Sequence, residues 1–133
     1  MITHIHHINF VVANLQASID YFSKLLAQQA IIEKLPQRNV NTARFKIGES
    51  LLILVQPLSE EGLVAEILAS KGEGIFLLSF ATESIDQTLL DLELSHAQKR
   101  VGLENWPICD ISPLEQFGAF LQLTQKPCKN YSN

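Results

Sequence analysis

The sequence carries one pattern twice, with a shift of 70 positions between the copies. Phe10 then falls on Phe80, where each copy reads as the end of a strand that leads into a helix. Helical spacing of apolar residues and a capping residue just before them are the usual signs of an amphipathic helix. Both signs coincide in the two copies, which predicts two copies of one β-α-β-β-β unit. The coinciding pairs are Leu15 with Ile85, Ile19 with Leu89, Phe22 with Leu92, and the caps Asn14 with Ser84.

Each copy reads as a strand, a capped helix and then further strands. Alternating side chains, unbroken apolar runs and turn residues set the expected limits of these elements. The segment Ser84–Gln87 has the form of a capping box, in which the fourth side chain reaches back to the N–H of the cap. A turn is expected at 36–39, and a short helix is expected to start with Ser59 as its cap and to end at Gly72. The predicted strands are 5–12, 40–47, 51–55, 75–81, 106–111 and 119–124.

Two half-sheets of this kind each need a partner face, so we expect an α+β fold. The two β-α-β-β-β repeats would form one curved mixed sheet around a cleft, with the helices outside. A length of 133 residues fits a single domain over 1–133. We place the first repeat at about 1–56, a short helical linker at 57–74 and the second repeat at about 75–126.

Composition removes several classes of function. Lys plus Arg is 10 and Asp plus Glu is 14, a net charge of −4 without a basic cluster, so nucleic acid is not an expected partner. No uncharged apolar run reaches the ~18 residues that a membrane span needs, and the N-terminal segment lacks the features of a signal peptide. Two cysteines, Cys109 and Cys128, are too few for a disulfide scaffold and fit a reducing cytoplasm. We therefore predict a cytoplasmic protein with no membrane partner.

Three segments resemble a known superfamily over nearly the whole chain: IHHINFVVANLQASIDYFSKLL (5–26), QPLSEEGLVAEILASKGEGI (56–75) and GAFLQLTQKP (118–127). They are similar to the vicinal-oxygen-chelate superfamily of glyoxalase, bleomycin-resistance and extradiol-dioxygenase proteins, and within it to the methylmalonyl-CoA epimerase branch. The resemblance implies a glyoxalase-like domain that forms a homodimer. It also implies a divalent ion, held by one residue from each of four strands, that stabilises an enolate next to the bound oxygens.

The same resemblance places the four metal-ligand positions on His7, Ile53, Leu77 and Gln122. Two of these side chains are hydrocarbon and offer no lone pair, and Gln122 is neutral where the family has a carboxylate. A single histidine with one amide does not hold a divalent ion against water. We therefore expect no cofactor, and a divalent metal remains the less favoured alternative.

The remaining residues on the expected cleft face are typical of a small-molecule site, because a few polar groups lie among apolar ones. The apolar residues are Leu51, Ile53, Val55, Leu77 and Ile108. Apart from His7 and Asp110, the residues we expect to contact a ligand are Asn9, Thr42, Arg44, Ser79, Phe120 and Gln122, with Trp106 at the rim.

His7 and Asp110 are the candidate catalytic residues. His7 is either an imidazole that moves a proton without a metal or a histidine that is hydrogen-bonded in the core. Asp110 and Arg44 occupy equivalent places in the two repeats. They form either a buried ion pair or a pair in which Arg44 receives a ligand carboxylate or phosphate while Asp110 orients it.

Three other residues receive no role in the chemistry. His4 and His6 share the opposite face of their strand and are expected near the surface, without a third metal ligand. Cys109 is expected to point away from the cleft as an inert thiol.

Three functions remain open from the sequence, and it does not decide between an enzyme and a binding protein. The favoured one is a glyoxalase- or epimerase-like protein with a degenerate metal site that binds a small organic ligand, an acyl-CoA or a hydrophobic carboxylate, with metal-independent proton transfer as an option. The first alternative is a metal-dependent methylmalonyl-CoA epimerase or lyase with re-sited ligands. The second is a non-catalytic dimer that sequesters a drug or another ligand.

Overall fold

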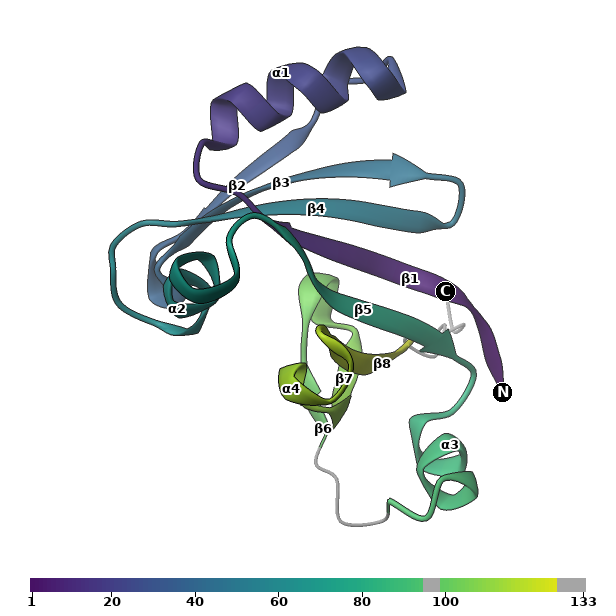
Figure 1. Cartoon of the computed structure of the whole chain (residues 1–133). Helices are drawn as coiled ribbons and strands as arrows, with labels where there is room; N and C mark the ends of the chain where they lie inside the picture. The colour runs from purple at the N-terminus through teal and green to yellow at the C-terminus, as the bar shows by residue number, and fades with distance from the viewer. Residues whose placement is uncertain (95–98, 127–133) are drawn as a thin grey trace. The chain divides into compact units, whose positions relative to one another are not determined.

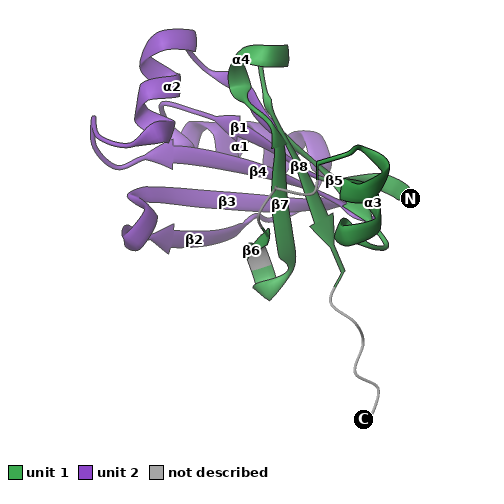
Figure 2. Cartoon of the chain, turned by 90° about the horizontal axis from the view of Figure 1, so that it is seen from below, with its two compact units in different colours: residues 1–6, 78–133 green, residues 7–77 purple. Residues whose placement is uncertain are grey.

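The computed structural model describes residues 1–94 and 99–126, and the fold is of the α+β class (Figure 1). The chain divides into two compact units, His7–Leu77 (unit 2) and Met1–His6 with Leu78–Asn133 (unit 1), which are coloured separately in Figure 2. The helices and strands are β1 (Ile2–Val11), α1 (Leu15–Leu26), β2 (Ile31–Leu35), β3 (Val40–Ile47), β4 (Ser50–Pro57), α2 (Leu63–Lys71), β5 (Gly74–Thr82), α3 (Ile85–Asp91), β6 (Lys99–Val101), β7 (Pro107–Ser112), α4 (Leu114–Phe117) and β8 (Phe120–Gln125).

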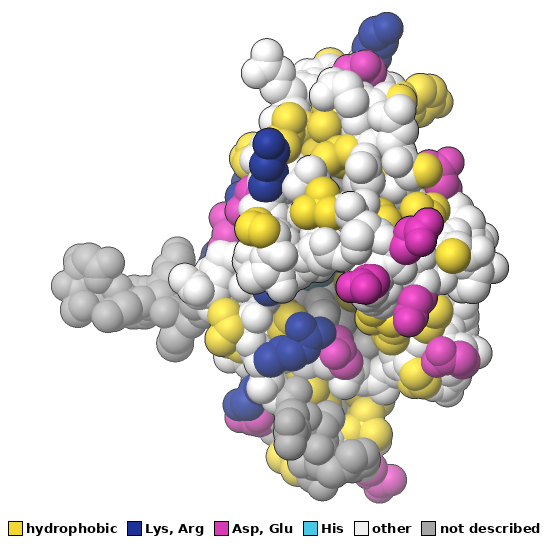
Figure 3. Space-filling view, turned by 90° about the vertical axis from the view of Figure 1, so that its left-hand side faces the viewer, with side chains coloured by type: hydrophobic (Ala, Val, Ile, Leu, Met, Phe, Trp, Pro, Cys, Tyr) yellow, Lys and Arg dark blue, Asp and Glu magenta, His cyan; other side chains and the backbone are white. Residues whose placement is uncertain are grey.

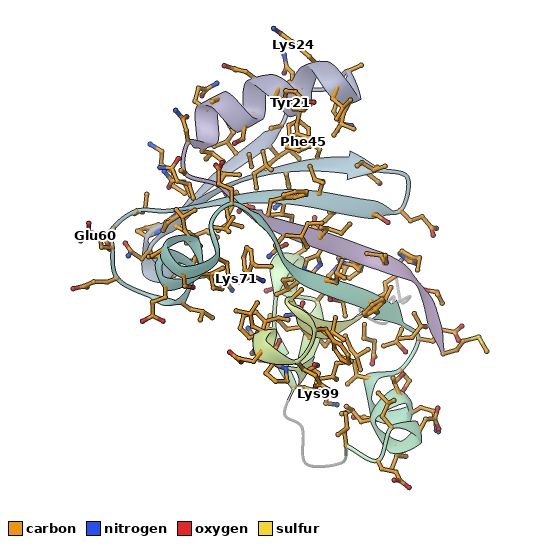
Figure 4. All side chains as sticks on the ribbon, viewed as in Figure 1. Tyr21, Lys24, Phe45, Glu60, Lys71 and Lys99 are labelled. Atoms are coloured by element: carbon orange, nitrogen blue, oxygen red, sulfur yellow. The ribbon has the colours of Figure 1, made fainter. Side chains whose placement is uncertain are left out.

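Unit 2 contains a mixed sheet with the strand order β2-β3-β4-β1. β3 is antiparallel to both β2 and β4, whereas β1 runs parallel to β4. Helix α1 covers one face of this sheet, and Phe45 of β3 lies between the helix and the strands (Figure 4). Its ring is 6.3 Å from that of Phe22, centroid to centroid. The buried core of the unit is Val12, Leu15, Ile19, Ala43, Phe45, Leu52 and Leu54.

Unit 1 contains the beginning of β1 and most of β5, in the order β1-β5-β8-β7-β6. β7 is antiparallel to both β8 and β6. Helix α3 packs on one face through Ile85 and Leu89, which lie against Cys109 of β7 and Leu123 of β8. Each unit therefore has one sheet face that its helix covers.

Both predicted caps are present. Asn14 Oδ1 accepts a hydrogen bond from the N–H of Ala17 at 3.0 Å, and Ser84 Oγ accepts one from the N–H of Gln87 at 3.1 Å. The paired β-α-β-β-β modules that the repeat predicts are confirmed. The cleft that we expect between the repeats stays a prediction.

A second contact repeats in both modules, and it was not predicted from the sequence. Gln56 Oε1 accepts a hydrogen bond from the N–H of Leu15, the first residue of α1, at 2.5 Å. Gln125 Oε1, 69 positions later, accepts one from the N–H of Ile85, the first residue of α3, at 2.7 Å. A glutamine in the last strand of each module thus satisfies one of the N–H groups that a helix leaves unpaired at its start.

Two predictions about helix starts were wrong. The helix expected to begin with Ser59 as its cap begins at Leu63, with Gly62 at the cap position. Ser59 Oγ instead accepts hydrogen bonds from the N–H of Glu61 at 3.1 Å and from the Asn39 amide at 2.6 Å, so it stabilises the turn before the helix.

The second error concerns the capping box at Ser84. The N–H of Ser84 donates to Thr82 Oγ1 at 3.3 Å instead of to the Gln87 side chain. Gln87 is directed along the helix and donates to Asp91 at 2.9 Å. Only the cap half of the capping box is therefore present.

Strands β2 and β6 and helix α4 were not predicted, and the units do not follow the expected repeat boundaries. Unit 2 begins inside β1, at residue 7, and ends inside β5, at residue 77. The organisation of the chain as one domain, with a helical linker at 57–74, stays a prediction.

Candidate functional site

The face of the unit 2 sheet opposite α1, which we call the α1-distal face, carries the residues predicted for the first repeat. The register pairs Asn9 of β1 with Ile53 of β4, and Ile53 with Arg44 of β3, so these three form one row across the sheet. Thr42 and His7 lie on the same face, because alternate residues of a strand point to the same side. The predicted sharing of one face by these residues is confirmed, and their roles stay predictions.

Arg44 has an acidic partner within its own unit. Its guanidinium forms an ion pair with Glu33 of β2, and the side chain of Arg44 is only 18% exposed. Sequence reasoning missed Glu33 because β2 was not predicted. The predicted pairing of Arg44 with Asp110 stays untested, but the charge of Arg44 is already balanced by Glu33.

Asn9 presents a buried polar atom on the α1-distal face. Among the described residues, none donates a hydrogen bond to Asn9 Oδ1. His7, two residues earlier on β1, is buried. A buried acceptor without a donor is costly, so such an atom marks a place where a ligand or a water molecule is expected.

In unit 1, the face opposite α3, which we call the α3-distal face, holds a polar network across three strands. Gln122 of β8 lies directly across from Asp110 of β7, and its Nε2 donates to Asp110 Oδ1 at 3.1 Å. Arg100 of β6 donates to the other carboxylate oxygen of Asp110 at 2.8 Å. Arg100 was missed in the sequence because β6 is a short strand with no apolar alternation.

Gln122 is the most buried member of this network. It is 3% exposed, while the side chains of Arg100 and Asp110 are about half exposed. Its Oε1 is buried and accepts no hydrogen bond within residues 1–94 and 99–126. Next to it, the hydroxyl groups of Ser79 and Thr124 are hydrogen-bonded to each other.

Trp106 contacts a residue that was expected elsewhere. Its ring centroid lies 4.3 Å from that of His6, and His6 is 4% exposed. The prediction of a near-surface His6 was therefore wrong, because the indole covers the imidazole. Burial lowers the pKa of His6 below its usual value, His4 lowers it further, and Glu104 opposes the effect.

The remaining residues that the sequence singled out differ in how deeply they are buried. Phe120 is half-buried on β8 and Leu77 is half-buried on β5. Cys109 is fully buried against α3, and burial raises the pKa of its thiol. Its direction away from the expected cleft stays a prediction. Cys128 lies outside the described residues.

The metal-ligand set that the resemblance implies does not fit a divalent ion. Ile53 is buried and has no donor atom, and Leu77 has none either. In the part of the chain that the structure describes, no three His, Cys, Asp or Glu side chains converge in a way that would hold a metal ion. The chemistry of the donor set, with one imidazole and one amide left, is the reason for this misfit.

An open groove of about 640 Å³ lies in unit 2, on the side of α1 that faces the end of β1. Phe10, Phe22 and Tyr21 contribute its aromatic lining, and Tyr21 is labelled in Figure 4. Glu73 also lines the groove, and its carboxylate accepts a hydrogen bond from the N–H of Ala13 at 2.9 Å. No pattern in the sequence indicated this groove.

The surface shown in Figure 3 carries Asp and Glu side chains among scattered Lys and Arg. None of the helices in the described part of the chain is both long enough and apolar enough to cross a membrane.

No model of a known protein family matches the chain. An uncharacterised Bacillus subtilis protein, YqjC, is 26% identical over 125 residues, which cover 90% of this chain and 89% of that protein. Among solved structures, the methylmalonyl-CoA epimerase of Mycobacterium tuberculosis matches with a TM-score of 0.79 at 21% identity, covering 96% of this chain and 90% of that chain. A variant of the Streptomyces coelicolor epimerase in complex with 2-nitronate-propionyl-CoA matches with a TM-score of 0.80 at 24% identity, covering 96% and 100%.

A methylmalonyl-CoA epimerase in complex with methylmalonyl-CoA and NH₄⁺ gives a TM-score of 0.79 at 24% identity, covering 96% of each chain. The chain therefore has the vicinal-oxygen-chelate, or glyoxalase, fold. More particularly, its structure is similar to that of methylmalonyl-CoA epimerases over nearly its full length.

Proposed function

We propose that this protein binds a small organic ligand, a CoA thioester or an apolar carboxylate, without a divalent ion. The observation that carries the proposal is that two buried amide oxygens, Asn9 Oδ1 in unit 2 and Gln122 Oε1 in unit 1, receive no hydrogen bond from any described residue. Each lies on the sheet face opposite the helix of its own unit. The apolar Ile53 beside Asn9 supports an organic ligand, because binding sites combine apolar surface with a few polar groups. CoA thioesters are bound in the second and third of the epimerase structures compared above.

The same proposal includes metal-independent proton transfer with His7 as the base. The imidazole takes the proton from the carbon next to the thioester, and the C–H electron pair moves into the carbonyl as an enolate. Return of the proton to either face of that carbon completes an epimerisation. In the absence of a metal, hydrogen-bond donors or nearby cations must stabilise the enolate oxygen, so only a comparatively acidic substrate would react.

Binding is tested with methylmalonyl-CoA, propionyl-CoA and free CoA, using the unfolding midpoint as the readout. We expect a thioester to raise the midpoint equally in EDTA and in added Co²⁺, because a ligand that binds the native state stabilises it. If a thioester raised the unfolding midpoint only when Co²⁺ was present, the metal-dependent alternative would be favoured. If no thioester binds, a panel of hydrophobic carboxylates and drugs is the next test, and binding without turnover would favour sequestration.

Turnover is tested by incubating methylmalonyl-CoA in deuterium oxide with EDTA and following the mass of the thioester. We expect the unaltered protein to exchange the proton next to the thioester for deuterium. His7→Gln should abolish this exchange while the thioester still binds. Absence of exchange at high protein concentration would remove the catalytic part of the proposal and leave the binding part. Sedimentation velocity on the same sample tests the homodimer that the family resemblance implies.

A further inference from the structure

The network on the α3-distal face fixes the orientation of the Gln122 amide. An ionised carboxylate only accepts hydrogen bonds, so Asp110 Oδ1 selects the NH₂ group of Gln122 at 3.1 Å. Arg100 holds the other oxygen of the same carboxylate at 2.8 Å. Because the amide nitrogen is held toward Asp110, the amide oxygen is directed away from it.

The amide oxygen that is directed away has no hydrogen-bond donor among the described residues. Gln122 Oε1 is buried, and none of the described groups donates a hydrogen bond to it. The side chain is only 3% exposed, so bulk water does not replace the missing donor. Within residues 1–94 and 99–126 the only other buried unpaired side-chain atoms are two more amide oxygens, those of Asn9 and Asn41. All three atoms are acceptors to which no described residue donates.

We propose that Gln122 Oε1 accepts a hydrogen bond from a donor on the acyl part of the ligand, and that the ligand is a hydroxyacyl thioester. The inference rests on the proposed function and narrows its ligand class. A hydroxyl group on the ligand supplies the missing hydrogen-bond donor. An ionised carboxylate at this point has no donor, and its oxygens would repel the lone pairs of Gln122 Oε1. Asp110 and Arg100 are positioning residues, because they hold the amide of Gln122.

The test measures binding of two matched pairs of thioesters by isothermal titration calorimetry: 2-hydroxypropionyl-CoA with propionyl-CoA, and 3-hydroxybutyryl-CoA with butyryl-CoA. We expect one hydroxyacyl thioester to bind about tenfold more tightly than its matched acyl thioester, because its hydroxyl satisfies a buried acceptor. Gln122→Leu should bring the ratio of the two dissociation constants in each pair to about one, while propionyl-CoA or butyryl-CoA still binds.

Asp110→Asn tests the positioning role. The asparagine amide offers a donor as well as an acceptor, so it no longer selects one orientation of Gln122, and the ratio should fall about threefold. Gln116→Leu is the matched control, since Gln116 bonds to Ser112 and lies outside the network. This control should leave the ratio unchanged.

The outcomes separate the two proposals. Equal binding of both members of each pair by the unaltered protein would overturn the hydroxyacyl inference and leave the proposed function intact. Failure of all four thioesters to bind would remove the CoA-thioester form of the proposed function, and this inference with it. The ratio of dissociation constants in the unaltered protein tests the hydroxyacyl inference even if Gln122→Leu does not fold.

Discussion

At the scale of single residues, His6 links burial to the pH dependence of stability. Its imidazole lies against Trp106 and is 4% exposed. Burial lowers the pKa of His6, so the unfolded chain takes up this proton at a higher pH than the folded protein does. The unfolded state therefore gains stability as the pH falls from about 6.5 through the folded pKa.

The first prediction follows from this linkage. His6→Gln should make the free energy of unfolding fall less steeply between pH 7.5 and pH 5 than in the unaltered protein. One group changes that slope by at most about 1.4 kcal/mol per pH unit. Urea unfolding at a series of pH values measures both curves. Parallel curves for the two proteins would show that His6 titrates alike in the folded and unfolded states.

Cys109 gives the second prediction, because its thiol is buried against α3 and its pKa is raised. In a Cys128→Ser background, a disulfide reagent should label Cys109 only as fast as the protein opens, and at once in denaturant. The rate of thiol release at pH 8 measures this. Rapid labelling of the folded protein would mean that Cys109 is accessible.

Single residues were predictable from sequence where strand alternation set their direction, and were missed where an edge strand was not recognised. Asn9 and Ile53 share a face because both strands alternate and their register is fixed. Glu33 and Arg100 lie on β2 and β6, whose residues are mostly exposed, so no apolar pattern marked either strand. The partners of Arg44 and Asp110 could therefore not be predicted.

At the scale of elements, the first turns of α1 and α3 are each hydrogen-bonded by side chains of the same module. Asn14 and Ser84 bond to N–H groups inside the first turn, and Gln56 and Gln125 bond to the N–H of the first helical residue. The caps were readable from the sequence, because capping is local. The glutamine contacts join positions about 40 residues apart, which a local pattern does not contain.

The third prediction is that Gln56→Ala and Gln125→Ala each lower the free energy of unfolding by about 1 kcal/mol, the usual value of one hydrogen bond. Chemical denaturation of the three proteins measures the loss. Gln16→Ala is the control, since Gln16 is an exposed residue of α1 that bonds only to Asp20 among the contacts described, and it should change stability by less than about 0.5 kcal/mol. A loss confined to one module would contradict the equivalence of the two contacts.

At the scale of the whole molecule, the repeat was the most informative feature of the sequence. It predicted the α+β class and the paired modules, because both follow from apolar periodicity and caps. It did not predict the division of the chain inside β1 and β5, since that depends on which strands pair across the modules. It could not test the metal site that the family resemblance implies, because two of the positions that the resemblance assigns to metal ligands, Ile53 and Leu77, have hydrocarbon side chains without a donor atom.

The last prediction tests whether these two side chains alone account for the misfit to a divalent ion. Ile53→Glu combined with Leu77→His adds two donors to His7 and Gln122, the positions that the family resemblance assigns to the metal. In EDTA the double variant should be roughly 2–5 kcal/mol less stable, because Ile53 is buried and the new groups lack partners. Co²⁺ at about 100 times its Kd should return about 2.7 kcal/mol of this loss.

The unaltered protein and Ile53→Glu alone are the controls, and neither should gain stability from Co²⁺. Thermal unfolding with and without the ion gives the comparison, and the visible spectrum of bound Co²⁺ reports its coordination. Recovery in the double variant alone would show that the four positions converge and that two hydrocarbon side chains keep the metal out. If Co²⁺ stabilised the unaltered protein as well, donors other than these four would have to be present, and the metal-dependent alternative would gain support.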